Sequence, residues 1–232
     1  MARNFSLEES EKAFIYRTSE RRWKIKSDIR GFLESAFDLF APRLCKYYAS
    51  HMQQLRLHPD YAGLEFGNPL EGPPDADSLP FACHTENWPP RAFTVPHRDV
   101  MNLAYGWCAV VALGPFDAQR GGHLVLHDLR VVVPFPHGSC ILIPSAFLWH
   151  SNVPVPRDQG RASLTFYTPG GLFRFIRNDF RTEASLVNSL AEVDRELHDK
   201  DKQRGAKFGA ALYSKFTEIT NPSQAELDPI LF

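Results

Sequence analysis

The stretch FTVPHRDVMN at residues 93–102 decides how the chain is interpreted, because it places a histidine and a carboxylate two residues apart, at His97 and Asp99. A short apolar run precedes this pair and is typical of a β-strand. A second histidine, His150, follows in the stretch FLWHSN at residues 147–152. Two histidines and one carboxylate on one face of an octahedral ferrous ion leave three coordination positions open. We therefore expect His97, Asp99 and His150 to bind Fe(II) and to form a catalytic metal centre.

A third motif begins at Arg161 and continues with Ala162 and Ser163. A guanidinium group can hold a carboxylate by two parallel hydrogen bonds, and Ser163 points the same way along a strand as Arg161. We expect both residues to bind the far carboxylate of 2-oxoglutarate. His123 is a candidate to hydrogen-bond its metal-side carboxylate, with a core histidine as the alternative. The pattern favours an Fe(II)- and 2-oxoglutarate-dependent dioxygenase, with ascorbate as the reductant and Arg91 as a candidate for the other pocket wall.

Short apolar runs separated by glycine and proline turns surround these motifs, and they predict strands. Many short strands at this spacing indicate a jelly roll of the cupin type, a double-stranded β-helix, and not a doubly wound fold. The metal motifs then fall at strand ends around the mouth of the barrel. The expected strands cover residues 92–95, 103–113, 123–126, 130–133, 139–143, 162–168 and 172–176.

The segments on either side of this core have a different pattern. Residues 1–56 show apolar residues at helical spacing, with a break near Pro42, and are expected to form an N-terminal helical support. Residues 57–90 are rich in proline and glycine and predict an irregular connection. The jelly-roll core with the metal site is expected over 91–182, followed by a C-terminal helical region over 183–232. The expected class is a single α+β catalytic domain flanked by helices.

Composition narrows the class of protein further. A chain of 232 residues with 44% hydrophobic residues is suited to one domain with a substantial core. No apolar run approaches the roughly 20 residues of a membrane span, and we identify no signal peptide, so we expect no membrane partner. Four scattered cysteines argue against a zinc finger and a disulfide framework. These features favour a nuclear or cytoplasmic protein, and we expect a monomer.

Six motifs in the predicted core resemble the fungal branch of the TET/JBP oxygenases, which oxidise the methyl group of 5-methylcytosine or thymine in nucleic acid. The resemblance covers roughly residues 90–183 and extends into NDFRT at 178–182. The flanking helices resemble the family only in position and character. The motifs are GPFD at 114–117, GGHL at 121–124, FPHGS at 135–139, IPSA at 143–146, HSN at 150–152 and PGGLFR at 169–174.

The resemblance supports the metal and 2-oxoglutarate roles given above and implies further residues for the substrate. Asn102 is implied as a reader of the base edge, since an amide offers both donor and acceptor. Tyr167 is implied as the surface on which a flipped base stacks. The alternatives are a turn-forming Asn102 and a core-packed Tyr167. Pro169 stands where animal relatives have a base-contacting histidine, so the methylated base that is recognised stays open.

Contacts to phosphate have to come from the same domain, because the net charge is only −1 and no separate DNA-binding module is recognised. One basic cluster contains Arg174, Arg177 and Arg181, and another lies within residues 17–30. We expect Arg174 to contact the substrate. The alternative is that both clusters are solvated helix faces.

These observations predict a methylcytosine dioxygenase of DNA demethylation in the nucleus, which flips 5-methylcytosine and oxidises it to 5-hydroxymethylcytosine, with the extent of further oxidation open. One alternative is the same chemistry on N6-methyladenine, RNA, a protein side chain or a small molecule. Another is a non-catalytic barrel that binds nucleic acid or protein. Removal of Asn102 or Tyr167 separates the first two, since only a base oxidase needs them, and failure to bind Fe(II) favours the third.

Overall fold

The computed structural model describes residues 19–61, 80–88 and 90–220, without the side chains of 19–28, 30 and 201–203. Helices and antiparallel strands are mixed, as the α+β prediction requires. The described elements are, in chain order, α2 (Ser19–Phe40), α3 (Pro42–Leu57), β1 (Cys83–Asn87), β2 (Cys108–Leu113), β3 (Leu124–Leu126), β4 (Val131–Val133), β5 (Cys140–Ile143), β6 (His150–Asn152), β7 (Ala162–Tyr167), α4 (Gly170–Arg177), α5 (Glu183–Ser189), α6 (Glu192–Ala211) and α7 (Phe216–Thr220).

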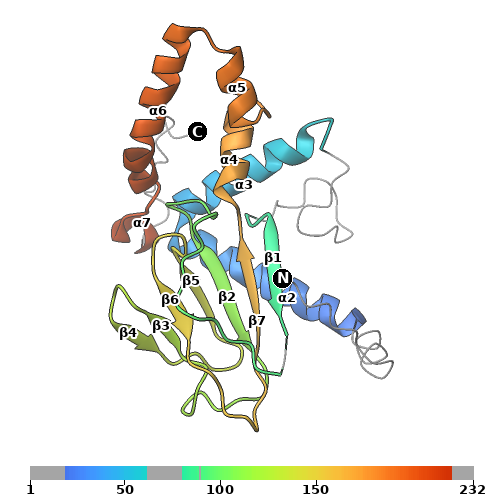
Figure 1. Ribbon diagram of the computed structural model, residues 1–232. Coiled ribbons are helices and arrows are strands. Elements are labelled where there is room, and N and C mark those ends of the chain that lie inside the picture. The colour runs from blue at the N-terminus through green and yellow to red at the C-terminus, as the bar shows by residue number, and fades with distance from the viewer. Residues whose placement is uncertain (1–18, 62–79, 89, 221–232) are drawn as a thin grey trace.

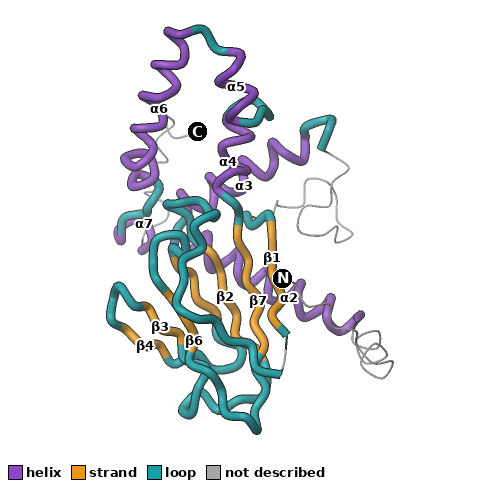
Figure 2. Tube along the Cα trace, in the orientation of Figure 1, coloured by secondary structure: helices purple, strands orange, loops and turns teal. Residues whose placement is uncertain are grey.

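The described strands form two antiparallel sheets (Figures 1 and 2). The larger sheet has the order β1-β7-β2-β5 and the smaller one β4-β3-β6. The segment before β2 extends the smaller sheet beside β6, because His97 and His150 form a backbone bridge and Asn152 N donates to Thr94 O. The chain therefore passes from one sheet to the other repeatedly between β1 and β7, which brings segments far apart in sequence into contact.

Side chains alternate along the central strands, so that one face of the larger sheet packs against the helices and the other faces the smaller sheet. Ala109 and Val111 of β2 belong to the hydrophobic cluster that α2 and α3 cover, whereas Cys108 and Ala112 pack on the opposite face with β3. Successive residues of a strand point to opposite sides of its sheet. In β7 the same alternation turns Leu164 and Phe166 toward the helices, whereas Ser163, Thr165 and Tyr167 line the cavity described below.

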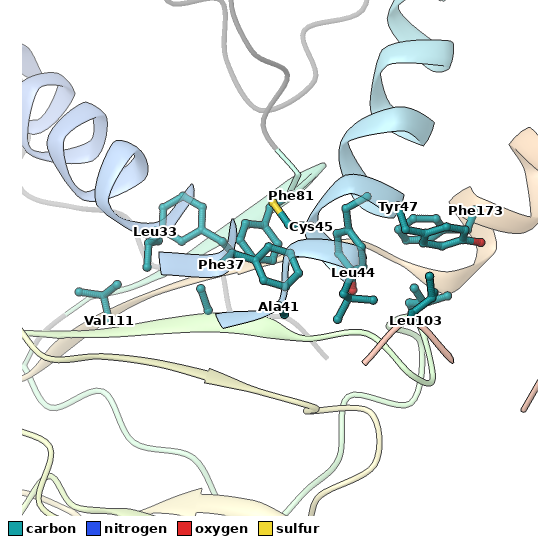
Figure 3. Packing of buried hydrophobic residues seen from close by; sticks show 14 of the residues in the cluster. Leu33, Phe37, Ala41, Leu44, Cys45, Tyr47, Phe81, Leu103, Val111 and Phe173 are labelled. Atoms are coloured by element: carbon teal, nitrogen blue, oxygen red, sulfur yellow. The ribbon is translucent and has the colours of Figure 1, made fainter. Parts of the chain in front are cut away.

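Helices α2 and α3 cover the outer face of the larger sheet, where aromatic rings fill the interface (Figures 1 and 3). Phe37 of α2 stacks on Phe81 with ring centroids 5.2 Å apart, and Tyr47 of α3 stacks on Phe173 of α4 at 5.3 Å. Such ring pairs contribute about 0.5–1.5 kcal/mol each beyond their buried area. Pro42 occupies the first turn of α3, where its missing N–H costs nothing, so the predicted break lies there. The helices therefore pack against the face of the larger sheet that is turned away from the smaller sheet.

The structure corrects the expected strand at 172–176, which lies in helix α4. Phe173 and Ile176, three residues apart, are the buried residues of this segment. That spacing matches one face of a helix, whereas a half-buried strand would bury every second residue. The run LFRFI was taken for a strand because its apolar residues fit the two-residue repeat of a strand as well as the spacing of three to four residues of a helix.

The expected irregular connection at 57–90 is also corrected, because β1 lies within it and pairs with β7 along its whole length. The sequence of β1, CHTEN, carries hardly any apolar signal. The strand expected at 103–113 begins only at Cys108, and residues 92–95 contribute backbone bonds without forming a strand of their own.

The helical segments around the core are consistent with expectation as far as they are described. The region expected over 183–232 contains α5, α6 and α7 up to residue 220. Residues 1–18, 62–79 and 221–232 belong to expected segments that lie outside the described residues. Across the ranges that are described, no helix combines the length and apolarity needed to cross a membrane.

Candidate active site

The imidazoles of His97 and His150 and the carboxylate of Asp99 converge between the two sheets. One ligand atom of each side chain lies within 4.8 Å of the others. His97 Nε2 is 3.5 Å from Asp99 Oδ1, and His150 Nε2 is 4.0 Å from Asp99 Oδ2. The two histidines exchange backbone hydrogen bonds of 3.0 Å, so the antiparallel register itself sets the rings side by side. The structure thus brings together all three residues of the expected metal centre.

Each of these histidines has its second ring nitrogen held by the backbone. His97 Nδ1 lies 2.8 Å from Val95 O, and His150 Nδ1 lies 2.9 Å from Leu148 O. A carbonyl oxygen can only accept, so Nδ1 carries the proton and the Nε2 lone pair faces the cluster. Burial lowers the pKa of His150, which favours the neutral imidazole that binds a metal. This donor set fits Fe(II).

Asp99 sits on a turn that is tied to the loop between β5 and β6. Its N–H donates to Ser145 O at 3.0 Å, and its carbonyl accepts from Asn102 N at 2.9 Å. The side-chain amide nitrogen of Asn102 donates to Ser145 Oγ at 3.2 Å and to Asp99 Oδ2 at 3.5 Å. Asn102 therefore helps to hold the Asp99 carboxylate in place, and it also lines the cavity where it is expected to read a base.

A cavity of about 450 Å³ extends from these metal-ligand candidates across the inner face of β7 and β1. Asn102, Ser163 and Tyr167 line it together with the triad. The Tyr167 hydroxyl accepts a 3.4 Å hydrogen bond from Thr85 of β1, which positions the ring at the cavity wall. The expected substrate residues Asn102 and Tyr167 therefore share one cavity with the metal-ligand candidates.

Arg161 lies at the far end of this region, in an adjoining cavity of about 360 Å³ that shares Asn87, Thr94 and Ser163 with the first. Arg161 is 1% exposed, and Nη1 donates to Ala92 O at 2.8 Å. Its buried Nε and Nη2 have no hydrogen-bond partner among the described residues. Burial lowers the pKa of this guanidinium, because the charged form is less stable away from water.

Two unmatched N–H groups on a buried cation fit a carboxylate ligand. Leaving a buried donor unsatisfied costs about 1–3 kcal/mol, and more on a charged group. A carboxylate would accept two parallel bonds from the guanidinium. The cavity end at Arg161 is therefore suited to the far carboxylate of 2-oxoglutarate, with Ser163 lining the same cavity from β7.

The surroundings of Arg161 include residues that were not predicted from the sequence. The ring of Phe116 lies 5.9 Å from the guanidinium carbon. Gly122 has a φ of +76°, and a Cβ there would come within 2.5 Å of the Phe116 ring. Gly122, which belongs to the GGHL motif, therefore lets this ring approach.

Asn87 was missed as well. Its amide nitrogen donates to Ser163 Oγ at 3.2 Å, and Thr85 and Asn87 both line the first cavity from β1. The only sequence signal for this pair is their spacing of two residues, which places both side chains on one face of a strand. Arg91, the candidate for the other pocket wall, lines the cavity at Arg161.

Two expected site residues lie elsewhere. His123 is half-buried and lines neither cavity, whereas its neighbour Leu124 faces the first one. Its expected hydrogen bond to the metal-side carboxylate of 2-oxoglutarate stays a prediction, and its half-buried position does not make it a core histidine. Arg174 lies on α4 in a separate cavity of about 320 Å³, together with Arg177, Glu183 and His198.

Comparisons with known proteins give similarity to solved structures alone. No protein-family model matches the chain, and no curated protein matches it. NgTET1 in complex with 5mC DNA has a TM-score of 0.41 and 14% identity, over 61% of this chain and 47% of that one. The viral collagen prolyl hydroxylase vCPH from Paramecium Bursaria Chlorella virus-1, as its 2OG complex, has a TM-score of 0.28 and 14% identity, over 37% of this chain and 60% of that one. The chain thus aligns with less than two thirds of either structure, and these likenesses carry no conclusion about its activity.

Proposed function

We propose that this chain is an Fe(II)- and 2-oxoglutarate-dependent dioxygenase of the TET/JBP type, which oxidises the methyl group of 5-methylcytosine in DNA. The observation that carries the proposal is the pairing of a His97–Asp99–His150 cluster with the unsatisfied guanidinium of Arg161 in adjoining cavities. Repeated passage of the chain between two antiparallel sheets supports a double-stranded β-helix as the core.

The chain's own residues have distinct tasks in this proposal. His97, Asp99 and His150 hold Fe(II), and Arg161 with Ser163 holds the far carboxylate of 2-oxoglutarate. When bound, the metal and 2-oxoglutarate use dioxygen to oxidise a C–H bond, with succinate and carbon dioxide as co-products. The backbone carbonyls at Val95 and Leu148 keep both imidazoles in the metal-binding tautomer. We also expect the enzyme to be a monomer.

Tyr167 and Asn102 supply the substrate end of the cavity. A base that leaves its stack needs an aromatic surface and a hydrogen-bonding edge. The Tyr167 ring lies at the wall of the same cavity as the triad, and Asn102 lies beside Asp99. The motifs that resemble the fungal TET/JBP oxygenases support a methylated base as the substrate, and a DNA substrate implies a nuclear location.

The basic cluster on α4 supports contact with a nucleic-acid backbone. Asn102 forms a bridge with Pro169, and their neighbours Leu103 and Gly170 line the cavity that contains Arg174 and Arg177. This cavity therefore lies across one backbone layer from the candidate active site. We infer that Arg174 and Arg177 contact phosphate.

The third arginine of this cluster has a local role. Arg181 donates to Asn178 O at 3.3 Å and to Ser189 Oγ at 3.4 Å, so it closes the turn between α4 and α5. The other expected basic cluster, within residues 17–30, lies outside the described side chains.

The test is mass spectrometry of nucleosides from a 5-methylcytosine duplex incubated with the protein, Fe(II), 2-oxoglutarate and ascorbate. A His97→Ala/Asp99→Ala variant is the control. Oxidised cytosine produced only by the unsubstituted protein supports the proposal. Succinate without any oxidised cytosine rejects this substrate and keeps the dioxygenase, and parallel N6-methyladenine and RNA substrates then identify the base. A protein that holds no iron and makes no succinate is not a dioxygenase.

A further inference from the structure

Two neighbouring apolar side chains are exposed to solvent at the edge of the candidate active site. Val100 is 72% exposed and Met101 is 78% exposed, and both line the cavity that holds the metal-ligand candidates. Single exposed apolar residues are ordinary on protein surfaces. An adjacent pair that directly follows a metal-ligand candidate, Asp99, is a more specific feature, because both side chains are exposed and also line the cavity that a ligand would occupy.

The turn that carries this pair is fixed on both sides. Asp99 N donates to Ser145 O on one side, and Gly170 N donates to Met101 O at 2.9 Å on the other. Asn102 N closes the turn on Asp99 O, and Leu103 N donates to Thr168 O at 3.3 Å. A turn held in this way cannot fold its apolar side chains into the core. Val100 and Met101 are therefore presented outward as a rigid projection.

A cation lies beside the same projection. Arg98, the residue between the two metal-ligand candidates of the turn, places its guanidinium carbon 5.0 Å from the centre of the Trp149 ring and lines the cavity. Stacking on tryptophan holds the charge at the rim. An arginine next to a small apolar projection matches duplex nucleic acid, whose phosphates are anionic and whose stacked bases are apolar on their faces.

We propose that Val100 and Met101 form a wedge that enters the base stack and occupies the space left by the flipped nucleotide. This inference rests on the proposed function and adds how the enzyme opens a duplex. Successive bases are about 3.4 Å apart along a strand, so a flipped base leaves a narrow, irregular gap. An unbranched, flexible methionine is suited to such gaps, and proteins that unstack bases insert side chains of this kind. A single strand needs no wedge, because its bases are already accessible.

The experiment compares duplex and single-stranded 5-methylcytosine substrates for the unsubstituted protein and for Val100→Ala/Met101→Ala. We expect the variant to lose about tenfold in kcat/KM on the duplex and less than about twofold on the single strand, since only the duplex needs unstacking. A second readout is the fluorescence of 2-aminopurine placed next to the target base, with Mn²⁺ in place of Fe(II). Its rise on binding of the unsubstituted protein should be largely lost in the variant.

Matched controls are available on the β3–β4 hairpin. Leu129 and Val132 are 56% and 57% exposed and do not line the cavity. Leu129→Ala/Val132→Ala should leave both readouts unchanged, and iron content and thermal unfolding verify that each variant is folded.

Two outcomes overturn the wedge while leaving the proposed function intact. Equal losses on duplex and single strand would identify a general substrate contact, and no loss on either would show that the pair has no role. If the unsubstituted protein turns over 2-oxoglutarate but oxidises neither substrate, the methylcytosine assignment itself fails, and the wedge fails with it. The pair would then belong to a substrate or partner of another class.

Discussion

The two ends of the candidate active site are built differently. At the metal end, both imidazoles donate to backbone carbonyls and the turn at Asp99 is tied to Ser145, so the polar groups already have partners. At the other end, Arg161 is buried with two N–H groups that have none among the described residues. The comparison indicates that the metal end is preorganised, whereas the Arg161 end has donors left over that a ligand could use. The four changes below test this difference.

The largest effect is expected from His97→Ala/Asp99→Ala. Removal of two of three metal ligands should lower activity by well over 100-fold, beyond the roughly 10–100-fold typical of outer-shell changes. Both side chains are partly exposed, so thermal stability without metal should change little. Bound iron, oxidised nucleosides and the melting temperature are the measurements. Retention of stoichiometric iron by this variant would contradict the assigned ligands.

Arg161→Met should separate binding from stability. The affinity for 2-oxoglutarate should fall by about 2–3 kcal/mol, because a charge-assisted two-point contact is lost. The free energy of unfolding without ligand should stay equal or rise by about 1 kcal/mol, because an incompletely paired buried charge is replaced by an apolar chain. Calorimetric titration and thermal unfolding with and without 2-oxoglutarate measure both.

Arg157→Met is the matched control for this change, since Arg157 is exposed on the loop before β7. It should leave affinity and stability unaltered. A strongly destabilised Arg161→Met protein would mean that the guanidinium is already satisfied in the free protein.

Asn102→Ala tests whether the metal end depends on its outer contacts. Loss of the bonds from its amide to Asp99 and Ser145 should weaken Fe(II) binding by about tenfold. The measurement is the dissociation constant for Fe(II) under anaerobic conditions, next to base oxidation at saturating iron. Unchanged iron affinity with lost base oxidation would leave base reading as the only role of Asn102.

A smaller effect than at Arg161 is expected from Ser163→Ala, where the two cavities meet. A single hydrogen bond to a charged carboxylate is worth about 1.5 kcal/mol, so the affinity for 2-oxoglutarate should fall roughly tenfold. Stability should change by less than for a core residue, because Asn87 is only partly buried and water can replace the lost acceptor. Calorimetric titration measures the affinity for 2-oxoglutarate. A loss of affinity as large as that of Arg161→Met would contradict the assignment of Arg161 as the main carboxylate-binding group.

The sequence was most informative where chemistry and local pattern coincide. Three features were visible because each motif adjoins a short apolar run: the spacing of His97 and Asp99, the position of His150, and the strand that directly follows Arg161. Most strands of the core were expected for the same reason, since β-branched residues between turns give a local signal. β1 escaped notice because CHTEN is polar, and α4 was mistaken for a strand because its apolar residues fit two periods.

The sequence by itself determined which side chains are available and on which faces of their strands they lie, because alternation along a strand is a local property. Only the tertiary structure decided which of these meet. The bridge between His97 and His150, the pairing of β1 with β7 and the approach of Phe116 to Arg161 join segments that are distant along the chain. Such contacts depend on register between strands and on burial, and neither is encoded within a short stretch of residues. The pairing of β3 with its neighbours likewise decided that Leu124 lines the cavity and that His123 does not.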